Sequence, residues 1–163
     1  MAGAVHHPVD VRKRHSYRVD AFDSGEAGPL ALVEEGRIRP LRDWPRGAAL
    51  GLEAVAAEPA GWPRVEVVTS HAGADGGIVR AAMAAGAKGI VVAGTGNGTV
   101  HEDLGSALRE AQAAGVRVLR ATRCAEGGVV GESADALPSA GVLSPVKARI
   151  ELLLELLSAR SGA

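Results

Sequence analysis

From residue 64 onward, the chain alternates apolar runs with segments of helical spacing, and this alternation restricts the fold more than any other feature. Three runs are short and apolar enough to be strands, at residues 64–70, 89–93 and 116–122. The middle run is apolar without interruption, as expected of a parallel strand buried on both faces. Strands that alternate with helices form a parallel sheet through right-handed crossovers. We therefore predict an α/β fold, a small three-layer parallel-sheet domain of the Rossmann-like or flavodoxin-like kind.

The two intervening segments have the start and end signals of helices. Asp75 can cap the first, and Gly86 is well placed to end it. Glu102 and Asp103 favour the start of the second because they complement the positive end of the helix dipole, and Gly115 closes it. Apolar residues at three- and four-residue spacing predict the core-facing sides. These are Ile78, Ala81, Ala82 and Ala85 in the first segment, and Leu104, Ala107, Leu108 and Ala111 in the second.

A final helix is predicted over residues 145–157, after a glycine-rich stretch at 126–141. Ser144 is its expected N-cap, and Pro145 is its first helical residue. Apolar side chains cover most of its circumference, so we expect one face in the core and another against a neighbouring subunit. The predicted core stripe is Ile150, Leu153 and Leu157, and the predicted subunit contact is Leu152 and Leu156.

Residues 1–62 differ from the rest, because they show no sustained helical period and contain five prolines. Their most regular stretch, ALVEEGRIRPL at residues 31–41, has two short runs around Glu35-Gly36, which predicts a β-hairpin. The remainder is typical of strand and linker without a core of its own. We therefore divide the chain into 1–62, an irregular linker with a hairpin, and 63–163, the α/β domain.

Charge and composition exclude several classes of partner. The chain holds 18 Lys and Arg against 19 Asp and Glu, a formal net charge of −1, which provides no basic surface for nucleic acid or anionic lipid. Aromatic residues make up 2% of the chain, too few for stacking on bases. No run approaches the roughly 20 apolar residues that cross a bilayer. We expect no nucleic-acid partner, no membrane partner and a cytoplasmic location.

The histidines and the cysteine lack the patterns that metal binding and thiol catalysis need. The five histidines have no HxH or HxxxH spacing, so no metal site is predicted. Cys124 is the single cysteine and cannot form an internal disulfide, which fits a reducing compartment. No acid–base pattern lies beside it in the sequence. We therefore expect Cys124 to be a small, partly buried residue rather than a nucleophile.

A glycine turn, GTGNG at residues 94–98, joins the second predicted strand to the second predicted helix. At the carboxyl edge of a parallel sheet, such a turn can present backbone amides to an anion. A dinucleotide fingerprint would need a glycine three residues after Gly96, where Thr99 stands, and an acid after the next strand. No lysine follows the turn, so a Walker motif is absent as well. Nucleotide binding is therefore disfavoured, whereas a structural turn and another kind of small-molecule site stay open.

Three stretches of the chain are informative together: HSYRVDAFDSGEAGPL at residues 15–30, KGIVVAGTGNGTV at 88–100 and LSPVKARIELL at 143–153. In this order and at these separations along the sequence, they resemble the bacterial-type L-asparaginases, also called asparaginase/glutaminase amidohydrolases. The resemblance covers nearly the whole chain. It implies that the chain begins at the tail of the family's N-terminal domain, crosses the interdomain linker, and contains the C-terminal domain.

The catalytic chemistry of that family needs groups that this sequence does not contain. Its members hydrolyse the side-chain amide of asparagine, and in some cases of glutamine, through an acyl-enzyme on a threonine hydroxyl. A hydroxyl is a weak nucleophile, so the family activates it with a Tyr and with a second Thr, an Asp and a Lys. These groups lie in TGGT-type and GTDT-type motifs, and this sequence has neither. No catalytic residue is therefore expected within the chain.

What the resemblance assigns to this chain is part of a substrate pocket, reached across the interface with a neighbouring subunit. The residue after GNG in the family's turn contacts the substrate's amino group, and Thr99 stands there. The family's loop glutamate matches Ala134 without a gap, and of the nearest carboxylates, Glu132 and Asp135, we nominate Glu132. The residues expected to shape the turn are Gly94, Gly96, Asn97 and Gly98.

The expected function is L-asparaginase-like hydrolysis, in which L-asparagine and water give L-aspartate and ammonia without a cofactor. The chain alone should be inactive. Its expected partner is another copy in a homo-oligomer or a complementary N-terminal domain. The preference between asparagine and glutamine stays open, because the deciding pocket residues are not in this sequence. The alternative is a non-catalytic α/β module for small-molecule binding or assembly.

Overall fold

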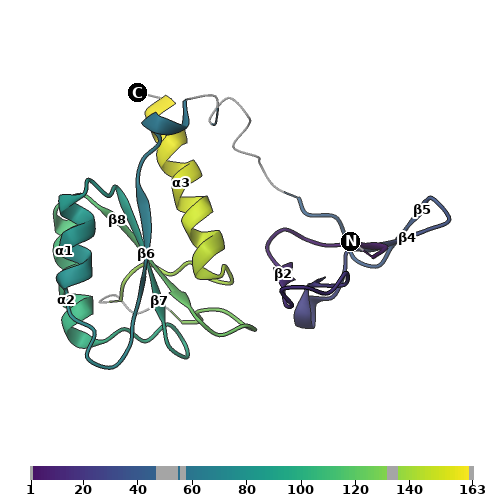
Figure 1. Cartoon of the computed structure of the whole chain (residues 1–163), viewed down its shortest axis with the longest axis horizontal. Coiled ribbons are helices and arrows are strands. Elements are labelled where there is room, and N and C mark those ends of the chain that lie inside the picture. Colours follow the sequence, from purple (N-terminus) through teal and green to yellow (C-terminus); the bar gives the residue numbers. More distant parts are fainter. Residues whose placement is uncertain (1, 47–54, 56–57, 132–135, 162–163) are drawn as a thin grey trace. The chain divides into compact units, whose positions relative to one another are not determined.

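The computed structural model describes residues 2–46, 55, 58–131 and 136–161. The chain divides into two compact units, Met1–Ala49 and Leu50–Ala163. Among the described residues, the α-helices all belong to the second unit, and the first unit is built from short strands and one 3-10 helix (Figure 1). The functional division after residue 62 stays a prediction.

The second unit is built on a parallel sheet with the strand order β6-β7-β8 (Figure 1). These strands are β6 Val65–Thr69, β7 Gly89–Gly94 and β8 Arg117–Thr122. Val91 at the centre of β7 is paired with Val67 of β6 and with Leu119 of β8. Every residue of β7 is buried, because it lies between two strands and two layers of helices. The three predicted strands are confirmed.

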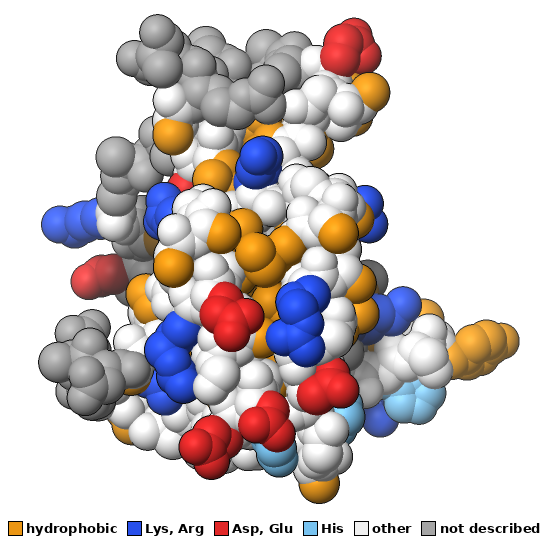
Figure 2. Space-filling model, turned by 90° about the vertical axis from the view of Figure 1, so that its left-hand side faces the viewer, with side chains coloured by type: hydrophobic (Ala, Val, Ile, Leu, Met, Phe, Trp, Pro, Cys, Tyr) orange, Lys and Arg blue, Asp and Glu red, His pale blue; other side chains and the backbone are white. Residues whose placement is uncertain are grey.

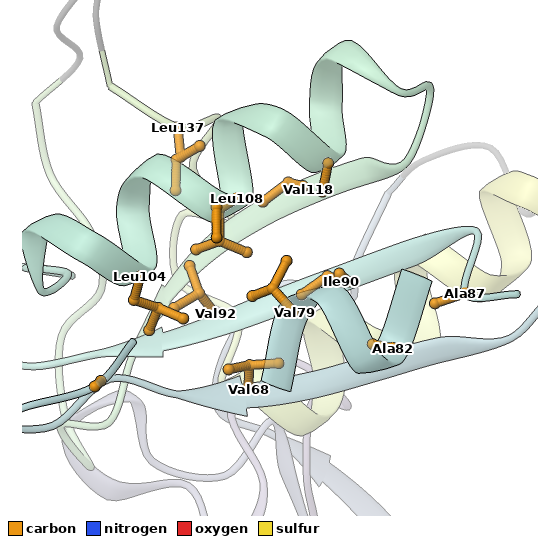
Figure 3. Close-up of a cluster of buried hydrophobic side chains, with 13 residues drawn as sticks. Val68, Val79, Ala82, Ala87, Ile90, Val92, Leu104, Leu108, Val118 and Leu137 are labelled. Atoms are coloured by element: carbon orange, nitrogen blue, oxygen red, sulfur yellow. The ribbon is translucent and has the colours of Figure 1, made fainter. Parts of the chain in front are cut away.

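Helices cover both faces of this sheet (Figure 1). They are α1 Gly77–Ala84, α2 Glu102–Ala113 and α3 Pro145–Ser161. Successive side chains of a strand point to opposite faces, so Ile90 and Val92 pack beneath α1 and α2, whereas Val91 packs beneath α3. Figure 3 shows the first of these two cores, with Val79 of α1 directed toward Ile90. The predicted three-layer α/β fold is confirmed.

The sequence predicted the buried side of α2 correctly, but that of α1 only at Ala82. All four predicted residues of α2 are buried. In α1, Ile78 is 59% exposed, and Ala81 and Ala85 are exposed too, whereas Val79 is fully buried (0%) and Ala82 is buried. An alanine-rich helix of eight residues has several apolar stripes, and the period alone does not choose between them. Exposed hydrophobic side chains among charged ones are visible on the outer face of these helices (Figure 2).

The start of α1 also differs slightly from the prediction. Gly76, not Asp75, occupies the N-cap position, and its missing side chain makes no capping bond. The Oδ1 of Asp75 nevertheless accepts a hydrogen bond of 2.7 Å from the backbone N–H of Gly77. Asp75 therefore satisfies one of the free N–H groups at this end of the helix, although it lies one residue before the N-cap position.

α3 begins at Pro145 as predicted, and Leu153 and Leu157 of the predicted core stripe are buried, but Ile150 of that stripe is not. Ile150 is 46% exposed, whereas Leu152 is fully buried (0%). Leu152 fills the space above Gly89 of β7, where a Cβ atom would lie 2.8 Å from Leu152 Cδ2. Leu152 is therefore a core residue and not the predicted subunit contact. Among the side chains described in this helix, Ala148, Leu153 and Leu157 are buried as well.

In the first unit, the predicted hairpin is confirmed as β4, Ala31–Glu34, and β5, Arg37–Pro40. Its two turn residues, Glu35 and Gly36, have φ values of 49° and 73°. Two positive φ values are what a type I′ hairpin turn requires. The Arg39 guanidinium donates hydrogen bonds of 2.9 and 2.8 Å to the Glu34 carboxylate, which lowers the pKa of Glu34.

The first unit has more regular structure than the sequence predicted. β1, Ala4–Val5, pairs with β4 and completes a three-stranded sheet, and β2, Arg12–Lys13, pairs with β3, Phe22–Asp23. Strands of two residues are too short to show a period in the sequence. This unit buries Ala21, Leu30 and Ala31. Two short 3-10 helices are described in full, η1 Gly25–Ala27 in the first unit and η3 Pro59–Gly61 in the second.

Candidate functional site

The glycine turn between β7 and α2 folds back on itself. The N–H of Thr99 donates to the carbonyl of Thr95 at 2.7 Å, and the N–H of Thr95 donates to the carbonyl of Thr99 at 3.0 Å. Between them, Gly96 and Gly98 have positive φ values of 47° and 77°. This conformation is easily reached by glycine, which has no Cβ. The turn leaves Thr99 exposed at the carboxyl edge of the sheet.

Gly94 and Gly98 approach each other closely at the base of the turn. A Cβ atom at Gly94 would lie 2.6 Å from the carbonyl carbon of Gly98 and 2.8 Å from its Cα. These are backbone atoms, which a rotamer change cannot move away. The turn therefore needs glycine at position 94 for space and at position 98 for backbone conformation.

We expect Gly94→Ala to lower the free energy of unfolding by about 1–3 kcal/mol, the usual cost of overpacking. Gly105→Ala is a suitable control, because its Cβ would meet nothing closer than 3.6 Å and alanine favours the helix in which it lies. Urea unfolding followed by circular dichroism at 222 nm measures both. Equal stability of Gly94→Ala and the wild type would contradict this close approach.

The end of β8 holds the turn from the side. The hydroxyl of the buried Thr122 donates to the carbonyl of Gly96 at 2.5 Å and accepts the N–H of Cys124 at 3.0 Å. The N–H of Arg123 donates to the carbonyl of Gly94 at 3.0 Å. Cys124 is exposed, so the prediction of a partly buried residue is wrong. It lies two residues beyond the end of β8 at Thr122.

The glycine-rich stretch after β8 is bound to the turn by Asn97. The side-chain Nδ2 of Asn97 donates to the carbonyl of Val130 at 2.7 Å, and its Oδ1 accepts the N–H of Val130 at 2.8 Å. The sequence indicated Asn97 as part of the turn but gave no sign of Val130, which lies 33 residues away.

The same stretch returns along the outer edge of β8. The N–H of Arg120 donates to the carbonyl of Pro138 at 2.7 Å, and the N–H of Ala140 donates to the carbonyl of Arg120 at 2.9 Å. Ser139 is thereby bridged in parallel to Arg120. This return brings Ala136 and Leu137 to the carboxyl edge of the sheet, beside the glycine turn.

A cavity of about 410 Å³ opens beside Thr99. Arg109 and Arg120 bring positive charge to its wall, and Glu102 brings negative charge. Its other lining residues are Gly98, Val100, His101, Gly105, Ala136 and Leu137. The structure thus brings together the turn, the start of α2 and the return of the glycine-rich stretch. The nominated Glu132 and its alternative Asp135 lie outside the described residues.

Within the described ranges, no three His, Cys, Asp or Glu side chains are grouped so that they could hold a metal ion. Likewise, none of the helices described is both long enough and apolar enough to span a membrane. At the carboxyl edge of the sheet, Thr99, the two arginines and Glu102 can offer hydrogen bonds and charge.

Two family models match the chain. The model described as Glutaminase/Asparaginase C-terminal domain matches residues 64–162, which include the sheet, the glycine turn and α3. The model described as Asparaginase, N-terminal matches residues 1–46.

Named relatives agree with these models. The chain is 32% identical over 153 residues to the glutaminase-asparaginase of Pseudomonas fluorescens, covering 90% of this chain and 42% of that protein. It is 37% identical over 127 residues to a glutamyl-tRNA(Gln) amidotransferase component of Aeropyrum pernix, covering 76% and 29%. The crystal structure of a probable cytoplasmic L-asparaginase from Campylobacter jejuni is similar with a TM-score of 0.82 at 29% identity, covering 94% of this chain and 48% of that one.

The chain therefore spans less than half the length of each of these proteins. The C-terminal model covers the α/β unit and the turn that carries Thr99, and the N-terminal model covers the strands that precede it. Fold, glycine turn and sequence matches agree that this chain belongs to the asparaginase/glutaminase amidohydrolase family.

Proposed function

We propose that this chain is the C-terminal part of an amidohydrolase that converts L-asparagine and water to L-aspartate and ammonia. The observation that carries the proposal is the exposed Thr99 on the wall of a cavity, at the end of a turn that the family model includes. Family membership supports amide hydrolysis as the reaction class. The preference for asparagine over glutamine is part of the proposal.

The chemistry is divided between this chain and another segment. A threonine hydroxyl from a TGGT-type motif attacks the amide carbon, ammonia leaves, and water then releases aspartate from the acyl-enzyme. This chain contributes the wall that holds the α-ammonium of the substrate. The Thr99 hydroxyl accepts a hydrogen bond from that ammonium, and the Glu132 carboxylate adds a charge-assisted bond.

The pocket lies between two polypeptide segments in this proposal. A second copy within a homo-oligomer, or a complementary N-terminal domain, supplies the nucleophile, and this chain supplies Thr99 across the interface. The proposed location is the cytoplasm.

The match to the glutamyl-tRNA(Gln) amidotransferase component favours a second candidate, because its 37% identity is no lower than the 32% identity to the glutaminase-asparaginase. In this case the chain would act as part of a glutamyl-tRNA(Gln) amidotransferase. Parallel assays with L-asparagine, with L-glutamine and with glutamyl-tRNA(Gln) distinguish the two candidates.

In a mixture with a polypeptide that carries both threonine motifs, Thr99→Ala should raise the KM for L-asparagine about tenfold or more while kcat changes little. A hydrogen bond to a charged group contributes about 1.5–3 kcal/mol, and about 1.4 kcal/mol corresponds to a factor of ten. An interaction made equally in the ground state and the transition state affects KM alone. Steady-state ammonia release measures both constants.

Thr99→Ser is the matched control, since it keeps the hydroxyl and should keep KM within about threefold of the wild type. An unchanged KM in Thr99→Ala would contradict the assignment of the ammonium to Thr99. Strong binding of L-aspartate by the chain without any partner would favour the non-catalytic module instead.

A further inference from the structure

The geometry points to Asn97 as a positioning residue that fixes residues 126–131 against the glycine turn and so stabilises the turn, whose Gly98 and Thr99 line the cavity. The catalytic consequence of this inference rests on the proposed function. The structural part, a coupling between two loops that are distant in sequence, does not.

One planar side chain satisfies both polar groups of the Val130 backbone. A carboxamide presents a donor and an acceptor side by side, which matches the C=O and N–H of one residue in an extended backbone. The two bonds, 2.7 Å from Asn97 Nδ2 and 2.8 Å to Asn97 Oδ1, form a closed ring. Aspartate has no donor for the Val130 carbonyl, and alanine has neither group.

The position of the Asn97 side chain is fixed because hydrogen bonds fix the backbone around it. The carbonyl of Gly96 accepts the Thr122 hydroxyl, and the carbonyl of Asn97 accepts a bond from Arg120 Nη1 at 3.4 Å. Both partners belong to β8. The reciprocal bonds between Thr95 and Thr99 close the turn on either side of Asn97. The side chain is therefore presented from the edge of the sheet.

The stretch that it holds has little stiffness of its own. Residues 126–131 contain three glycines, of which Gly127 and Gly131 have positive φ values of 74° and 78°. Glycine allows many backbone conformations, so fixed contacts must select one. The Val129 side chain packs on Gly98, where a Cβ would lie 2.9 Å from Val129 Cγ2, and the Val129 N–H donates to the carbonyl of Gly141 at 2.9 Å.

The chain offers a direct spectroscopic test, because Asn97 is its only asparagine and Gln112 its only glutamine. In the full chain uniformly labelled with ¹⁵N, the side-chain amide of Asn97 should exchange its protons with water more slowly than the Gln112 amide does. The backbone N–H of Val130 should exchange about tenfold faster or more in Asn97→Ala, because a hydrogen-bonded amide exchanges only on opening. Gln112→Ala, near the other end of α2, is the matched control. Protection of Ile90 reports that the core remains folded.

Asn97→Asp separates hydrogen bonding from simple loss of packing. Its carboxylate cannot donate to the Val130 carbonyl at pH 7, but the protonated acid can, and a free Asp has a pKa of about 3.9. Because its carboxylate still accepts the Val130 N–H, protection of Val130 at pH 7 should lie between those of Asn97→Ala and the wild type. Corrected for the intrinsic effect of pH on exchange, it should rise toward the wild-type value as the pH falls toward about 4 in this variant only. Unchanged Val130 exchange in both variants, with Ile90 protected, would overturn the coupling.

The functional arm uses the chain mixed with the partner polypeptide. Asn97→Ala should raise the KM for L-asparagine about tenfold with kcat within about threefold, whereas Gln112→Ala should change neither. Faster Val130 exchange with an unchanged KM would overturn the positioning role. If the wild-type mixture releases no ammonia, the proposed function fails, and the exchange data still decide whether Asn97 holds the loop.

Discussion

Ammonia release from L-asparagine by the purified 163-residue chain is expected to be indistinguishable from the rate in buffer. None of the chain's threonines lies in the TGGT-type or GTDT-type context in which the family activates its nucleophile. At the carboxyl edge of the sheet, Thr99 is exposed, whereas Thr122 is buried and bonded to Gly96. Enzymes accelerate their reactions by about 10⁶-fold or more, so the expected deficit is at least of that order. A coupled assay for ammonia measures it.

Addition of a polypeptide that carries both threonine motifs should restore turnover in the same assay. The matched control is that polypeptide without the present chain, which lacks the wall that carries Thr99. Turnover by the chain alone at an enzyme-like rate of about 1–10³ s⁻¹, retained through repeated purification, would contradict the division of the site between two segments.

Leu152→Ala should lower the free energy of unfolding of the second unit by about 2–5 kcal/mol, the range for truncation of a buried leucine. Leu152 is fully buried in the core beneath α3 and lies against Gly89 of the central strand. Its removal leaves a cavity that the neighbouring strand cannot fill without moving. Because the α-helices that the structure describes all belong to this unit, urea unfolding followed at 222 nm reports its stability.

Ile150→Ala is the matched control, two residues away on the same helix and 46% exposed. Its expected effect is within about 0.5 kcal/mol, as for other surface substitutions. The pair tests the rotation of α3 directly, since the sequence pattern predicted the opposite assignment. A larger loss of stability from Ile150→Ala than from Leu152→Ala would contradict the packing described for this helix.

The strands could be predicted because their signal is local. β7 is apolar at every position from Gly89 to Gly94, and β-branched residues bounded by turn signals are sufficient to predict a buried strand. The α2 stripe was equally clear, because polar residues occupy the rest of its circumference. In α1 and α3, apolar residues lie on several faces. The rotation of those helices was therefore decided by which side chains fit the sheet, such as Val79 on Ile90.

Only part of the candidate site could be predicted from the sequence. Thr99 and the glycines of the turn could be identified because they adjoin one another in the chain and resemble a family motif. The roles of Val130 and Arg120 could not, since their partner Asn97 is distant in sequence and one side of each contact is a backbone atom, of Val130 in the first case and of Asn97 in the second. Backbone N–H and C=O groups are common to nearly all residues, so a contact made by them cannot be predicted from the residue type.

By itself, then, the sequence determined the α/β alternation, the hairpin, the position of the glycine turn and the family to which the chain belongs. Each depends on residue types at fixed local spacing, which the chain carries whatever its surroundings. Only the tertiary structure decided which faces of α1 and α3 are buried and which loop is bound to the turn. Those outcomes depend on shape and on hydrogen bonds between distant segments, and they exist only once the sheet has brought the segments together.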